Sequence, residues 1–313
     1  MPESRIDFYG TFCYYRSVNR LVWSAVTKNT NWRILVEYIF LPDKTIVKNI
    51  NNFDPDQTLD CGQAFRWQKQ ADNSYTGTAF GRTINVAKVG GDLVIANTTP
   101  QEFNTLWLKY FDLETDYEQI KTEIKHLHPT LQKAAEFAPG IRILRQEPFE
   151  ALVSFIISQN NNIKRIKGII DRLCANFGQQ LPDGTFAFPT PSALASLTPA
   201  ELEPIRAGFR HRYIIDCAQK VASGQVDFEV CRFAPLPQAR AELMKICGVG
   251  TKVADCVLLF GFYRLQSFPL DVWMKRAMQS LFLGLSPEDF GPYAGIAQQY
   301  IFHYCRMNPN ILE

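Results

Sequence analysis

The order of two hydrophobic periodicities constrains the fold of this chain more than any other feature. Short strand-like segments separated by glycine-containing turns come first: Ala64–Gln68, Tyr75–Ala79, Thr83–Val89 and Leu93–Ile95. Apolar residues at helical spacing dominate from about residue 117 to the end of the chain. Strands followed by helices predict an α+β fold, in which an N-terminal antiparallel β-sheet packs beside an all-helical body.

The same pattern divides the chain into three parts. Residues 1–45 form an N-terminal extension that is rich in aromatic residues and shows no clear period, so the sequence leaves its structure open. Residues 46–130 are expected to form an antiparallel β-sheet domain with flanking helices, and residues 131–313 a helical domain. At roughly 150 residues per domain, a chain of 313 residues has room for two domains.

Composition excludes several classes of protein. Hydrophobic residues make up 46% of the chain and charged residues 20%, which excludes global disorder. The longest apolar stretch, near residues 32–41, is interrupted by Arg33 and Glu37 and is too short to span a membrane. The net charge is only +2, so any contact with nucleic acid must come from local basic patches.

The cysteines and histidines show no pattern typical of disulfides or of a metal site. The eight cysteines include no C-x-x-C pair and have no small-domain disulfide spacing, which predicts reduced thiols in an intracellular protein. Such a protein would lie in the cytoplasm of a bacterium or the nucleus of a eukaryote. The four histidines form no ligand cluster, so we expect no metal.

Two helical segments joined by a Gly-x-Gly turn lie between about residues 239 and 262. Gly248 and Gly250 form the turn, and the second helix starts at Thr251. Glycine N–H groups and the positive end of that helix can bind an anion such as a DNA phosphate. A plain helix–helix turn with a glycine cap explains the same residues equally well.

A lysine and an aspartate follow this turn. Lys252 lies in the first turn of the second helix, where the helix dipole disfavours a cation, and is therefore a candidate amine nucleophile. A solvated or phosphate-binding lysine fits the position as well. Asp271 follows Pro269 and has helix N-capping as its default role. A helix and a return loop separate it from Lys252, so both groups can face one cleft and act together at a sugar carbon.

The chain resembles the helix–hairpin–helix DNA glycosylase superfamily and, within it, the 8-oxoguanine DNA glycosylases. The resemblance covers roughly residues 46–313 and rests on five motifs in the right order. These are Leu59-Asp60-Cys61-Gly62-Gln63-Ala64-Phe65-Arg66-Trp67, Ser158-Gln159-Asn160-Asn161-Asn162-Ile163, Cys247-Gly248-Val249-Gly250-Thr251-Lys252-Val253-Ala254-Asp255-Cys256, Pro269-Leu270-Asp271-Val272 and Gly291-Pro292-Tyr293-Ala294-Gly295.

The resemblance implies roles for individual residues. Lys252 would be the Schiff-base nucleophile and Asp271 its catalytic carboxylate. The backbone carbonyl of Gly62 would accept the N7–H that distinguishes 8-oxoguanine from guanine. The flipped base would lie between Cys256 and Phe302, and its pairing edge would be read by Gln298.

On the opposite strand, the resemblance implies that Asn160 fills the gap left by the flipped base. Arg165 and Arg210 would then hold the orphaned cytosine. Two positions differ from animal members of the family: Phe209 stands where they carry an intercalating tyrosine, and Trp273 where they carry a histidine. Phe209 keeps the aromatic ring of the wedge and loses its hydroxyl.

The sequence therefore predicts a bifunctional DNA glycosylase and β-lyase that removes 8-oxoguanine, and related oxidised purines, from double-stranded DNA. We expect a monomer with no metal or organic cofactor and no membrane contact. Iron–sulfur relatives need four closely spaced C-terminal cysteines, whereas only Cys305 follows Cys256 here. Two alternatives stay open: a glycosylase for another lesion such as an alkylated base, and a non-catalytic DNA-binding hairpin protein.

Overall fold

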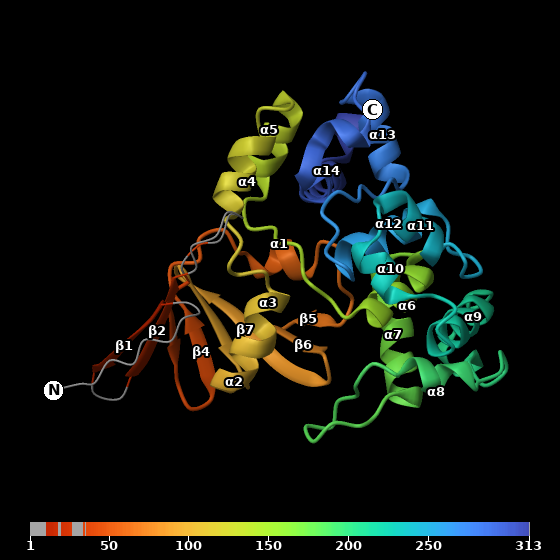
Figure 1. The fold of residues 1–313 in the computed structure, drawn as a ribbon, viewed down its shortest axis with the longest axis horizontal. Coiled ribbons are helices and arrows are strands. Elements are labelled where there is room, and N and C mark those ends of the chain that lie inside the picture. Colours follow the sequence, from red (N-terminus) through yellow and green to blue (C-terminus); the bar gives the residue numbers. More distant parts are fainter. Residues whose placement is uncertain (1–10, 18–19, 27–33, 35, 313) are drawn as a thin grey trace.

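An eight-stranded antiparallel β-sheet is followed along the chain by a helical body (Figure 1). The computed structural model describes residues 11–17, 20–26, 34 and 36–312. The strands are β1 (Thr11–Ser17), β2 (Arg20–Val26), β3 (Tyr38–Phe40), β4 (Lys44–Val47), β5 (Trp67–Lys69), β6 (Tyr75–Ala79), β7 (Arg82–Val89) and β8 (Asp92–Ala96). Their order across the sheet is β1-β2-β3-β4-β8-β7-β6-β5. This arrangement confirms the predicted α+β class.

The sheet begins earlier in the chain than the sequence indicated. The segment 1–45, whose structure the sequence left open, supplies β1, β2 and β3, and the expected boundary between residues 45 and 46 falls inside β4. β3 has only three residues, and a strand this short shows almost no alternation in the sequence. The rest of the extension, at 1–10, 18–19, 27–33 and 35, lies outside the described residues.

Helices of varied length make up the remainder. Those between the strands or directly after the last strand are α1 (Pro55–Leu59), α2 (Pro100–Glu102), the π-helix η1 (Phe103–Trp107) and α3 (Leu108–Tyr110). Those that follow are α4 (Tyr117–Ile124), α5 (Pro129–Phe137), α6 (Pro148–Ser158), α7 (Ile163–Phe177), α8 (Pro191–Ala195), η2 (Glu203–Ile205), α9 (Arg210–Ala222), α10 (Phe228–Phe233), α11 (Leu236–Leu243), α12 (Thr251–Phe260), α13 (Val272–Ser280), η3 (Pro287–Tyr293), α14 (Ala294–Met307) and η4 (Pro309–Leu312).

The buried apolar side chains form two clusters, one against the sheet and one inside the helical body. Leu113 belongs to the sheet cluster, whereas Tyr117 at the start of α4 belongs to the helical cluster. Apart from Phe65 in the helical cluster and Leu144 in the sheet cluster, the two cores divide along the chain between these two residues. The expected domain boundary after residue 130 falls inside α5. α5 packs against α14, near the C-terminus, a long-range contact that local periodicity does not reveal (Figure 1).

A connector with no regular structure, residues 141–147, runs between the two clusters. Its backbone groups are satisfied by side chains from both sides. Gln63 Nε2 donates to the carbonyl of Arg142 at 2.7 Å, and Gln63 Oε1 accepts from the Leu144 N–H at 2.9 Å. The hydroxyl of Tyr117 accepts from the Ile143 N–H at 2.8 Å. Because each buried backbone group left unpaired would cost about 1–3 kcal/mol, these side chains fix the path of the connector.

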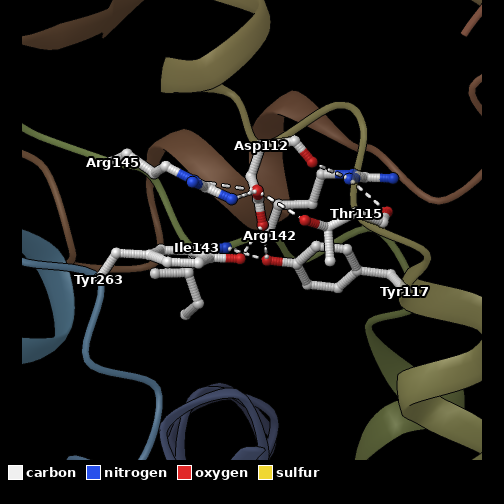
Figure 2. Close-up of polar contacts among 7 residues, drawn as sticks. All are labelled: Asp112, Thr115, Tyr117, Arg142, Ile143, Arg145 and Tyr263. Carbon is white, nitrogen blue, oxygen red and sulfur yellow. Dashed lines mark hydrogen bonds and ion pairs between the residues drawn. The ribbon is translucent and has the colours of Figure 1, made fainter. Parts of the chain in front are cut away.

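The carboxylate of Asp112 bonds to the connector and to residues of the helical body (Figure 2). Its Oδ1 pairs with the guanidinium of Arg145, whose Nε lies 3.1 Å away. Its Oδ2 accepts from the hydroxyls of Tyr117 at 3.0 Å and Tyr263 at 2.6 Å. Burial and then the Asp112 charge raise the pKa of Tyr263, so this hydroxyl stays protonated and donates. Asp112 therefore joins the end of the sheet domain, the connector and the segment after α12.

We predict that Asp112→Asn lowers the free energy of unfolding by about 3 kcal/mol, because it removes one partner of a buried ion pair. Asparagine tolerates the left-handed backbone at this position, where φ is 53°, so the change isolates the lost charge. Urea unfolding followed by circular dichroism measures the effect. Glu123→Gln, at an exposed carboxylate of α4, should change stability by less than about 0.5 kcal/mol. Equal stability of both variants would contradict the role of Asp112.

Candidate active site

The helix–hairpin–helix consists of α11, a turn and α12. Gly248 has a φ of 78°, and a Cβ atom on it would lie 2.5 Å from the ring of Tyr213. Gly248 is therefore required by the turn and by packing. Gly250 is the N-cap residue of α12, and a Cβ there would meet nothing within 4 Å. The absence of a side chain at Gly250 instead leaves the N–H groups at the start of α12 open to an approaching anion.

The charges of Lys252 and Asp271 both act on one buried thiol, that of Cys256. Burial raises the pKa of Cys256 to about 11, while the nearby charge of Lys252 lowers it and that of Asp271 raises it. Lys252 Nζ also lies 5.5 Å from the centre of the Phe155 ring. The structure therefore brings the two predicted catalytic groups together across the loop between α12 and α13.

Asp271 does cap α13, as its position in the sequence suggests. Its Oδ1 accepts from the N–H of Met274 at 2.8 Å. Its Oδ2 has no hydrogen-bond partner among the described residues. The cap thus holds one oxygen of the carboxylate and leaves Oδ2 free of hydrogen bonds to the described residues.

The residues predicted to bind the base come from two distant parts of the chain. Gly62 has a φ of 96°, and a Cβ on it would lie 3.8 Å from Cε1 of Phe302. Gln298, one turn earlier on α14, is 3% exposed and donates through Nε2 to the carbonyl of Pro269 at 3.3 Å. α14 therefore brings Phe302 to the loop of Gly62 and Gln298 to the loop that carries Asp271.

The residues predicted to contact the opposite strand also gather. Asn160, with a φ of 46°, lies in the turn between α6 and α7. Phe209 is 59% exposed, and the guanidinium of Arg210 stacks 4.4 Å from the centre of its ring. Burial and then the charge of the exposed Arg165 lower the pKa of Arg210, which places the two guanidinium groups near one another.

Arg210 differs from its predicted role in one respect. Its side chain is 3% exposed, and it donates to the carbonyls of Gln159 and Asn160, the latter at 3.2 Å. A third donor reaches the carbonyl of Ala207 at 3.1 Å. The structure therefore shows Arg210 supporting the asparagine turn, while Arg165 stays exposed beside it.

Sequence reasoning missed two buried glutamines at this site. Gln63 holds the connector, and Gln299 donates through Nε2 to Oε1 of Gln298 at 2.9 Å. A signal for Gln299 was present: two adjacent glutamines interrupt the apolar first half of α14, where an unpaired amide would be costly. Only the folded structure identifies their partners.

In the described part of the chain, no three His, Cys, Asp or Glu side chains are grouped so that they could hold a metal ion. None of the helices described is both long and apolar enough to cross a membrane.

A β-sheet domain followed by a helical body with a helix–hairpin–helix is also the architecture that the comparisons with known proteins identify. Residues 153–288 match the family model of the HhH-GPD superfamily of base excision DNA repair proteins. Residues 45–152 match the model of the 8-oxoguanine DNA glycosylase N-terminal domain. The chain belongs to the 8-oxoguanine DNA glycosylase/AP lyase family of this superfamily.

Three relatives illustrate the similarity. A probable N-glycosylase/DNA lyase of Methanothermobacter thermautotrophicus is 30% identical over 63% of this chain and 72% of its own length. The N-glycosylase/DNA lyase of Saccharomyces cerevisiae is 38% identical, but the match spans 51% of this chain and about half, 48%, of the yeast protein. A structure of the Clostridium acetobutylicum 8-oxoguanine glycosylase/lyase, bound to DNA with cytosine opposite 8-oxoguanine, superposes with a TM-score of 0.82. It is 39% identical and covers 89% of this chain and 99% of that one.

The two hairpin glycines should separate folding from DNA binding. Gly250→Ala meets no neighbour, so its unfolding free energy should stay within about 0.5 kcal/mol while its affinity for duplex DNA falls roughly tenfold. Gly248→Ala forces a clash and a left-handed alanine and should destabilise the protein by about 2–4 kcal/mol. Urea unfolding and fluorescence anisotropy with a labelled duplex measure the two effects. Full affinity in Gly250→Ala would show that phosphate does not approach this turn.

Proposed function

We propose that this protein excises 8-oxoguanine, and related oxidised purines, from duplex DNA and then cleaves the strand by β-elimination. The observation that carries the proposal is the meeting of Lys252 and Asp271 beside Cys256, at the end of the hairpin. The Clostridium structure, whose DNA contains 8-oxoguanine, supports the assignment of the substrate.

Lys252 supplies the nucleophile. The unprotonated Nζ attacks C1′ of the damaged nucleotide, and the base departs with the electron pair of the glycosidic bond. The free Oδ2 of Asp271 stabilises the positive charge that develops on the sugar. Loss of a proton from nitrogen and opening of the sugar ring give a Schiff base, which acidifies the C2′ protons. Removal of one of these protons expels the 3′ phosphate and nicks the strand.

Gly62 identifies the lesion through its backbone. Its carbonyl accepts the N7–H of 8-oxoguanine, which guanine lacks, and a carbonyl facing the N7 lone pair of guanine would be left unpaired. The flanking residues Cys61 and Gln63 are both buried and hydrogen-bonded, so the carbonyl cannot turn away. Cys256 and Phe302 form the two walls of the base site, and the high thiol pKa keeps Cys256 neutral.

The opposite strand is held by the second group of residues. Flipping a base leaves a gap and an unpaired cytosine, and the unpairing costs a few kcal/mol. Asn160 fills the gap, Phe209 inserts its exposed ring beside it, and Arg165 donates to the O2 and N3 acceptors of the cytosine. Arg210 acts mainly by holding the turn of Asn160, to whose carbonyl it donates at 3.2 Å.

The nucleophile can be tested by trapping. Borohydride should reduce the Schiff base on an 8-oxoguanine duplex to a covalent protein–DNA adduct. Lys252→Gln should abolish both the adduct and base release, while its duplex affinity changes less than about threefold, since the amide keeps the size of the side chain. Lys133→Gln, the same change at an exposed lysine of α5 that has no ion pair with the described residues, serves as the matched control and should still form the adduct. Nicking by Lys252→Gln would rule out this nucleophile.

Excision rates opposite different bases distinguish the role of Arg165 from that of Arg210. Thymine presents a donor at N3 where cytosine presents an acceptor, a mismatch of about 1–3 kcal/mol that predicts ten- to hundredfold faster excision opposite cytosine. Arg165→Ala should bring this ratio of rates close to one, while the excision rate opposite adenine changes little. Arg210→Ala should slow excision opposite every base, because the asparagine turn loses its support. Single-turnover rates opposite all four bases measure both effects, and equal rates in the unmodified protein would remove the cytosine contact.

A further inference from the structure

A chain of buried hydrogen bonds connects the residue that reads the base edge with the loop that carries Gly62. The Gln298 amide donates to the carbonyl of Pro269 at 3.3 Å and accepts from Gln299 Nε2 at 2.9 Å. Gln299 Oε1 in turn lies 3.5 Å from the sulfur of Cys61. Gln298, Gln299 and Cys61 are 3%, 4% and 0% exposed, so water does not compete for these bonds.

The partners at both ends determine how the amides are oriented. The carbonyl of Pro269 can only accept, so the nitrogen of Gln298 faces it and the oxygen of Gln298 faces Gln299. At the other end, burial raises the pKa of the Cys61 thiol to about 11, so it keeps its proton. Its sulfur accepts from Gln63 at 3.4 Å, and its proton is shared between the carbonyl of Thr58 and Gln299 Oε1. Gln299 therefore presents its nitrogen, and not its oxygen, to Gln298.

The orientation of the Gln298 amide matters because two kinds of purine present opposite edges. A 6-oxopurine such as 8-oxoguanine offers an acceptor at O6 and a donor at N1, whereas a 6-aminopurine such as 8-oxoadenine offers a donor at N6 and an acceptor at N1. A glutamine amide that turns freely through 180° satisfies either edge. An amide held in one orientation has one lone pair and one N–H left for the base and satisfies only one of them.

We propose that Gln299, supported by Cys61, is a specificity-determining residue that locks the Gln298 amide in the orientation for a 6-oxopurine and so excludes 6-aminopurines. The inference rests on the proposed function, in which Gln298 reads the base edge. It assigns to Gln299 a positioning role, since its own amide is used up by Gln298 and Cys61. The same hydrogen bonds connect Gln298 to the loop of Gly62. The two residues proposed to recognise the base therefore belong to one hydrogen-bonded unit.

The experiment compares single-turnover excision of 8-oxoguanine and 8-oxoadenine, each opposite cytosine, by the full chain. Gln299→Met keeps the length of the side chain and removes the donor. Because one neutral hydrogen bond is lost, the ratio of the two rates should fall about two- to tenfold, mainly through faster excision of 8-oxoadenine. Tyr300→Phe is the matched control, because the neighbouring Tyr300 hydroxyl is buried with no hydrogen-bond partner among the described residues, and its ratio should stay unchanged.

Variants at Cys61 and Gln298 distinguish positioning from a structural effect. Cys61→Ala should lower the ratio in the same direction as Gln299→Met, and Cys61→Ser, which keeps a donor, should restore it. In a Gln298→Met background, where no amide is left to orient, Gln299→Met should no longer change the ratio. An unchanged ratio in Gln299→Met, or an equal effect of that change with and without Gln298, would overturn the inference. If the unmodified protein excises neither base, the proposed function itself fails.

Discussion

The hydrogen bonds of Gln63 fix the relation between the two layers of the protein. The residue is fully buried, and its side-chain amide bonds to three backbone groups, at Thr58, Arg142 and Leu144. Its own carbonyl accepts from Gln146 at 2.7 Å. Without these bonds, the connector would bury several unpaired backbone groups, at about 1–3 kcal/mol each. Gly62 precedes Gln63 directly, so the proposed lesion reader is held by the same bonds that join sheet and helices.

The far end of the connector reaches the helix of the proposed nucleophile. The N–H of Gln146 donates to the carbonyl of Phe260, the last residue of α12, at 3.0 Å, and Asp112 accepts from Tyr263 just beyond it. Lys252 lies near the other end of α12, eight residues before Phe260, or about 12 Å away at 1.5 Å per residue. Because a helix of this length is stiff, contacts at Phe260 and Tyr263 also set where Lys252 lies relative to Gly62. Gly62 and Lys252, which are far apart in the sequence, are therefore both positioned by contacts of the connector.

Local features such as the limits of a strand could be predicted from the sequence, whereas contacts between distant parts of the chain could not. The strand β6 has the predicted limits, Tyr75–Ala79, since the alternation of apolar and polar residues acts over a few residues. The connector carries no periodic signal, because side chains from elsewhere satisfy its backbone. For the same reason the support given by Arg210 to the asparagine turn and the partner of Gln299 were not predicted: burial of a polar group shows that a partner exists but not which one.

Asp271 shows why the structural and the catalytic interpretation of one residue need not compete. A helix cap requires only one acceptor, and Oδ1 fulfils this requirement with the N–H of Met274. That bond also removes the rotational freedom of the carboxylate, so Oδ2 is held in place before any DNA binds. Orienting a charged group during folding, rather than during the reaction, is how an enzyme avoids reorganising its site in the transition state. The cap that made the residue look ordinary in the sequence is thus what orients its second oxygen for the proposed role at the sugar.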